Sequence, residues 1–219
     1  MSAENTARAD ARGVIGIAAA AAGMVLFAFC AHQGLPWLVA GVGGFAMAAA
    51  AIAWSGFGDA QPAELLGLEG FTRKAAVIAI AGLAIGTGAG LAHRSTLGMP
   101  LFPTAGVEAF VLLACLIGAV EELIYRGWLQ GRARMLGWPA AVVIAAVAHA
   151  AYKTALFAWP ADPVPVDLAG IAVWTAAGGI VLGLLRVVSG SIVPPMLAHI
   201  AFDFVVYRSI ADPPWWVWG

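Results

Sequence analysis

The sequence predicts an all-α protein, a polytopic transmembrane helical bundle of about seven spans, and three observations lead to this fold class. First, 62% of the 219 residues are hydrophobic and only 11% are charged, whereas a soluble domain is roughly 45–50% apolar and about 25% charged. Second, apolar runs close to the roughly 20 residues needed to cross a bilayer recur along almost the whole chain. Third, the basic residues stand beside these runs. We therefore expect residues 1–219 to form a single integral membrane domain.

The expected spans follow from the apolar runs and from the polar or proline-containing segments between them. They lie at residues 13–31, 36–56, 73–92, 106–127, 138–157, 168–187 and 192–208. The first run follows basic residues, but it is long for a signal peptide and further spans come after it, so we expect an uncleaved helix. Segment 56–72 is expected to be a solvated, partly interfacial connection, and the prolines of segment 92–105 prevent a helix there. Pro213 to Trp218 should end the last helix and anchor it at the headgroups.

Small residues dominate the first three expected spans and predict close helix packing. They are Ala18 to Ala22 in the first span, Gly41, Gly43 and Gly44 in the second, and Gly82, Gly86 and Gly90 in the third. Such residues let helix backbones approach closely, which is how helices associate within lipid. We therefore expect residues 1–104 to be scaffold helices, although the glycines of the third span could alternatively form a surface for substrate docking.

The distribution of basic residues predicts the orientation of the chain. On one side of the expected spans lie Arg8, Arg12, Arg73, Lys74, Arg126, Arg132, Arg134 and Arg186. The opposite side receives only Arg94 and Arg208, with Lys153 inside the fifth span. Because basic loops remain in the cytoplasm, we expect a cytoplasmic N-terminus. The abundance of Ala and Gly and the scarcity of Lys are typical of bacterial chains, so the expected location is the bacterial inner membrane.

Charge and cysteine content exclude several classes of function. The formal net charge of -1 leaves no basic face to neutralise phosphates, so no nucleic-acid partner is expected. Cys30 and Cys115 both lie in apolar runs and form no close pair. Each is expected to be a small buried hydrophobic residue and not a ligand or half of a disulfide.

Ionisable residues within the expected spans point to a functional site. They are Glu121, Glu122 and Arg126 in the fourth span, His149 and Lys153 in the fifth, and His199 and Asp203 in the seventh. A charged group inside a bilayer costs about 2.5–3.5 kcal/mol on insertion scales. Polar groups on separate helices can satisfy one another only by converging, so we favour one shared site over scattered polar packing residues.

Helical spacing suggests how these side chains pair. Glu122 and Arg126 are four residues apart and therefore share a helix face, as do His199 and Asp203. Glu121 projects about 100° away from Glu122, as residues adjacent on an α-helix do. We expect Arg126 to neutralise Glu122 and Glu121 to remain free for chemistry, although the Glu122–Arg126 pair could be purely structural.

These motifs resemble those of the CPBP family, the CAAX proteases and bacteriocin-processing enzymes that include the Ras-converting endopeptidase. The family's ordered motifs are E-E-x-x-x-R, F-x-x-x-H and H-x-x-x-N/D. Here they correspond to the segments Glu121 to Arg126, Ala145 to His149 and His199 to Asp203. The resemblance covers residues 105–208, which would form the protease core.

Two positions depart from the family pattern. Ala145 stands where the second motif usually has an aromatic residue, so the packing near His149 is expected to differ. Asp203 stands where the better-studied members have Asn, which can donate a hydrogen bond to an oxyanion. Asp203 must either be protonated to donate or act by orienting His199. Of these two roles we favour the second.

The resemblance implies a glutamate-dependent intramembrane endopeptidase without metal or cofactor. Glu121 and His149 would activate a water, and His199 with Asp203 would stabilise the oxyanion. The partners would be the lipid bilayer and a membrane-associated protein or peptide substrate. Two other functions stay open: a zinc protease, although H-E-x-x-H is absent, and a non-catalytic scaffold, immunity factor or proton-coupled transporter.

Overall fold

The chain folds into a bundle of helices with no strand among the residues that the computed structural model describes, which are 3–31, 37–56, 62–69, 71–102, 106–158 and 166–210. The helices are α1 (Ala3–Cys30), α2 (Trp37–Gly56), α3 (Pro62–Leu66), α4 (Arg73–Thr96), α5 (Phe110–Glu122), η1 (Leu123–Leu129), α6 (Gln130–Ala133), η2 (Arg134–Leu136), α7 (Trp138–Ala158), α8 (Leu168–Ser189) and α9 (Val193–Tyr207). This confirms the predicted all-α membrane bundle. The expected anchor at Pro213 to Trp218 lies outside the described residues.

Within the part of the chain that the structure describes, five helices are long and apolar enough to cross a membrane. They are Ala11–Cys30 within α1, Trp37–Trp54 within α2, and the whole of α4, α7 and α8. The seventh expected span is the apolar but shorter α9, which has 15 residues. The fourth expected span is interrupted, because α5 has 13 residues and then continues as the π-helix η1.

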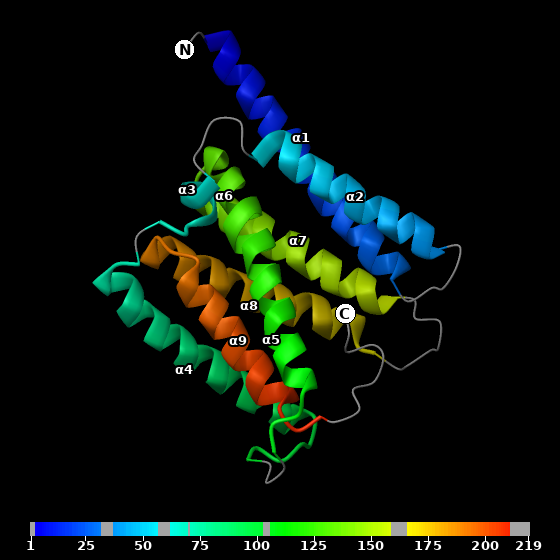
Figure 1. The fold of residues 1–219 in the computed structure, drawn as a ribbon, viewed down its shortest axis with the longest axis vertical. Coiled ribbons are helices and arrows are strands. Elements are labelled where there is room, and N and C mark those ends of the chain that lie inside the picture. The colour runs from blue at the N-terminus through cyan, green and yellow to red at the C-terminus, as the bar shows by residue number, and fades with distance from the viewer. Residues whose placement is uncertain are drawn as a thin grey trace.

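Figure 1 shows the arrangement of these helices, with α5 at the front of the bundle beside α9. The α1–α2 hairpin packs against α7 on one side of the bundle, and α4 packs against α9 on the other. Between them, α5 contacts α9 and α7 contacts α8. The helices with the ionisable residues, α5, α7 and α9, therefore lie between the flanking helices of the first hundred residues.

Local sequence signals explain several helix ends. The side chain of Thr72 caps the N-terminus of α4 by accepting a hydrogen bond from Ala75 N at 3.1 Å. Asp167 caps α8 in the same way, with Gly170 N at 2.9 Å from its Oδ1. Gly190 ends α8 in the left-handed conformation, with φ of +73°. Helix α9 begins with prolines at its first turn, where the missing N–H groups cost nothing.

The glycines of α4 bring this helix into backbone contact with α9. A Cβ atom at Gly82 would lie 2.7 Å from Pro194 O, and one at Gly86 would overlap Ala198 O. At Gly90 it would lie 2.9 Å from Val205 Cβ. The close approach expected of small residues in membranes thus holds α4 against the helix that carries His199 and Asp203.

Segment 62–69 differs from the expected solvated connection because it is anchored to the helix ends. Leu65 is buried in the core cluster, and its carbonyl accepts a hydrogen bond from Arg186 Nη2 at 3.3 Å. Ile192 N donates to Gly67 O at 3.0 Å. Gly67 has φ of +72°, and a side chain there would run into the Arg186 guanidinium. Glu64 remains exposed, as a solvated connection requires.

Arg94 also differs from its expected place in a loop. Helix α4 continues to Thr96, and the fully buried Arg94 donates to Pro100 O at 2.7 Å and to Val206 O at 2.9 Å. A guanidinium has five donors, so one side chain can satisfy several of the free carbonyls at the end of α9. Arg94 therefore joins the ends of α4 and α9.

The α4–α9 contact predicts opposite effects for two glycines of one helix. Gly86→Ala should lower the free energy of unfolding by about 1–3 kcal/mol, because its methyl group would push α9 away. Gly88→Ala is the matched control, since a Cβ there meets nothing within 4 Å. It should be neutral or stabilising by up to about 1 kcal/mol. Denaturant titration in detergent measures both, and equal stability of the two variants would contradict the packing role.

Candidate active site

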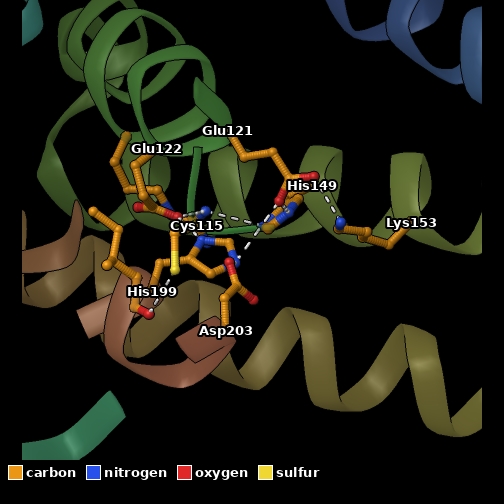
Figure 2. A network of polar contacts seen from close by, with 9 residues as sticks. Cys115, Glu121, Glu122, His149, Lys153, His199 and Asp203 are labelled. Atoms are coloured by element: carbon orange, nitrogen blue, oxygen red, sulfur yellow. Dashed lines mark hydrogen bonds and ion pairs between the residues drawn. The ribbon is translucent and has the colours of Figure 1, made fainter. Parts of the chain in front are cut away.

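The structure brings the six predicted site residues together where α5, α7 and α9 meet, and it adds Lys153 to them. Figure 2 labels all of these residues except Arg126. Glu121 and Glu122 end α5, Arg126 lies in η1, His149 and Lys153 lie on α7, and His199 and Asp203 lie on α9. Adjacent members of this group are joined by hydrogen bonds and ion pairs.

Glu122 connects two of the helices through one carboxylate oxygen. Its Oε1 lies 2.8 Å from Arg126 Nη1 and 2.8 Å from His199 Nδ1. The side chains of Glu122 and Arg126 are both 0% exposed. A carboxylate paired with a guanidinium only accepts hydrogen bonds, so His199 carries a proton on Nδ1 and donates it to Glu122.

The π-helix η1 begins directly after Glu122 and contains Arg126. Its wider turn is seen in the hydrogen bond from Gln130 N to Tyr125 O, five residues back. π-helical turns occur mostly as single turns inside α-helices and frequently at functional sites. The sequence did not reveal this feature, because the 123–129 segment has the composition of an ordinary α-helix.

Arg126 also determines the tautomer of His149. Its Nη1 lies 3.0 Å from His149 Nδ1, and because arginine has only donors, Nδ1 must accept. The proton of the neutral ring is then on Nε2, which donates to Glu121 Oε2 at 3.1 Å. Tyr125 stacks on the His149 ring at 4.5 Å between centroids. This aromatic contact comes from η1, and Tyr152 of α7 adds a second ring at 6.5 Å from that of His149.

Glu121 is not left free, contrary to the expectation from helical spacing. Lys153 Nζ lies 2.6 Å from Glu121 Oε1, and His149 occupies the other oxygen. Among the ionisable residues of the expected spans, Lys153 is the one to which the sequence assigns no pairing and no role. The signal was its spacing of four residues from a site histidine, which puts both side chains on one face of α7.

Asp203 forms an ion pair with His199 but no direct hydrogen bond, and its favoured role of orienting His199 stays a prediction. The distance from Asp203 Oδ2 to His199 Nε2 is 3.8 Å, which is too long for a hydrogen bond. The direct hydrogen bond to this ring comes from Glu122. His199 Nε2 also lies 3.8 Å from Glu121 Oε2, and thus at the same distance from two carboxyl groups.

Gly118 makes room for the side chains of α9. It lies one turn before Glu122, and a Cβ atom there would overlap Asp203 Oδ2 and lie 3.2 Å from His199 Cδ2. Any larger residue would therefore displace the carboxyl group or the imidazole.

Exposure increases across the site from Glu122 towards Lys153. The exposed fraction of the side chain is 0% for Glu122, 6% for Glu121, 12% for His199 and 20% for Lys153. The accessible edge of the site is therefore formed by Lys153 and His199, while the Glu122–Arg126 pair lies at its closed end.

No group of three or more His, Cys, Asp or Glu side chains within the described ranges has the arrangement of a metal site. The carboxylates instead have basic side chains as neighbours. Cys115, which was expected to be buried, is only half-buried, with Sγ 3.6 Å from Ile200 O.

The buried ion pair predicts a large cost for removing its cation. Arg126→Gln should lower the free energy of unfolding by about 3–5 kcal/mol, because it leaves Glu122 buried without its counter-ion. Glu122→Gln in the same chain should restore part of this loss. Denaturant titration tests both, with Arg73→Gln, at the exposed start of α4, as the control. Additive effects of the two substitutions would contradict the pairing.

Taken together, the fold and the site define an integral membrane protein with a buried cluster of carboxylates and histidines. Residues 103–205 match the family model described as type II CAAX prenyl endopeptidase Rce1-like. This segment contains every residue of the site, and over it the chain is similar to the Rce1-like family of CAAX-type proteases. Comparisons with curated proteins and with solved structures give no match.

Proposed function

We propose that the protein is a glutamate-dependent intramembrane endopeptidase in which Glu121 is the general base. One observation carries this proposal. Glu121 Oε2 lies 3.1 Å from His149 Nε2 and 3.8 Å from His199 Nε2. A water bound to this oxygen would therefore have a carboxylate to take its proton and an imidazole on either side to hold it.

Hydrolysis at this site needs no covalent intermediate. Glu121 takes a proton from the water while the water oxygen bonds to the scissile carbonyl carbon. The resulting oxyanion needs donors, and His149 Nε2–H becomes available as Glu121 loses its charge. When the C–N bond breaks, Glu121 returns the proton to the leaving amine.

The α9 residues complete the proposed oxyanion site. His199 donates Nδ1–H to Glu122, so its Nε2 donates to the oxyanion only when the ring carries both protons. A protonated Asp203 on the same helix face would donate as Asn does in the better-studied members of the family. In this proposal Glu122 and Arg126 support the reaction by holding both imidazoles in place.

The proposed substrate is a membrane-associated peptide or protein tail. A site among membrane helices is suited to a chain segment held in or at the bilayer. The basic segments before α4 and after α5 support a cytoplasmic N-terminus, with the bacterial inner membrane as the proposed location.

The proposal predicts loss of cleavage when the base or either histidine is removed. Glu121→Gln, His149→Ala and His199→Ala should each reduce turnover by at least about 100-fold, since general acid–base groups contribute roughly 10²–10⁴. The assay uses protein in lipid nanodiscs with a library of membrane-anchored peptides, and mass spectrometry locates the cleaved bond. Glu64→Gln, which alters an exposed carboxylate of α3, should retain full activity.

Other outcomes of the same assay would favour a different function. Cleavage by the Glu121→Gln variant would contradict a glutamate base. Loss of cleavage on chelation, with recovery after Zn²⁺ is added, would indicate a zinc protease. Absence of cleavage by the wild-type protein across the library, together with transport that depends on a proton gradient, would favour a transporter.

A further inference from the structure

Lys153 is the one site residue that belongs to none of the three sequence motifs. It lies on α7, one turn beyond His149, and Figure 2 shows its side chain extending towards Glu121. Its Nζ is 2.6 Å from Glu121 Oε1. The same helix therefore provides two donors to one carboxylate, with Lys153 on Oε1 and His149 on Oε2.

The charges of the site explain why such a cation is present. Glu121 and Glu122 are adjacent in the chain, and both are almost completely buried. A buried carboxylate requires a partner, because burial removes the water that would otherwise stabilise its charge. Arg126 is the partner of Glu122, and Lys153 is the corresponding partner of Glu121.

The contacts with Lys153 and His149 also determine the orientation of the Glu121 carboxylate. With Oε1 held by Lys153, Oε2 faces His149 and lies 3.8 Å from His199. A carboxylate has about four acceptor positions, so these two contacts leave places for a water. Without Lys153 the group could rotate and bring its proton-accepting oxygen out of line with the imidazoles.

We propose that Lys153 is a positioning residue for hydrolysis, which holds Glu121 Oε1 so that Oε2 faces the two imidazoles. This inference rests on the proposed function, in which Glu121 is the general base. Lys153 acts through Glu121 and forms no bond to the substrate. Its place at the accessible edge of the site, with 20% of the side chain exposed, distinguishes it from the buried Arg126.

The test compares turnover and substrate affinity in the Lys153→Met variant, which keeps the length of the side chain but loses the charge. We expect kcat per folded protein to fall by about 10–100-fold, because a misplacement of about 1 Å can cost a factor of 10². KM should stay within about twofold of the wild-type value, since Lys153 does not touch the substrate. Lys153→Arg restores a cation and should recover part of kcat.

Lys74→Met provides the matched control. Lys74 is the other lysine of the chain and is exposed in the first turn of α4, so its replacement should leave both constants unchanged. Lys153→Gln is a second variant with the same expected loss, in case Lys153→Met does not yield folded protein. Size-exclusion chromatography determines the folded fraction for every variant.

The outcomes separate this inference from the proposed function. If Glu121→Gln is inactive but Lys153→Met and Lys153→Gln retain wild-type kcat, the inference is wrong and the general base stands. A raised KM with unchanged kcat would show that Lys153 binds the substrate, which also contradicts positioning. If Glu121→Gln still cleaves, the proposed function itself fails, whatever the lysine variants do.

Discussion

The buried ion pair between Glu122 and Arg126 is the interaction on which the rest of the site depends. From this pair, Glu122 holds His199 of α9 and Arg126 holds His149 of α7, each through one hydrogen bond. Both imidazoles are thereby placed against the end of α5. A carboxylate and a guanidinium without exposure to water strongly favour the geometry in which all their contacts are made. The pair therefore joins three helices at one point.

Close backbone packing supports this polar centre. The glycines of α4 let this helix pack closely against α9. Gly118 of α5 leaves space for the Asp203 and His199 side chains of α9. Arg94 ties the far end of α9 to α4 through backbone carbonyls. In lipid, helices gain little from hydrophobic association, so small residues and buried hydrogen bonds determine how they pack. The distances within the site follow from these contacts.

The two adjacent glutamates have different surroundings and therefore different capacities. Glu122 is at the closed end, with an arginine that cannot lose its proton and a histidine that donates to it. Glu121 is nearer the accessible edge, with a lysine on one oxygen and the Nε2–H group of His149 on the other. Because Glu122 is fully buried, it is suited to holding other side chains in place. The position of Glu121 near the accessible edge suits it to contact a water and a substrate.

The sequence by itself determined the all-α membrane fold, the approximate helix bounds, the resemblance to a protease family and six of the seven residues that meet in the site. These follow from local properties: apolar runs, short motifs and residues four apart on one helix face. Only the tertiary structure decided that Lys153 pairs with Glu121, that Glu122 and not Asp203 forms the hydrogen bond with His199, and that η1 is a π-helix. It also decided that Arg94 and segment 62–69 pack against the helix ends. Contacts between helices depend on the rotation and depth of each helix, which are set by packing of the whole bundle and cannot be obtained from the spacing within one helix.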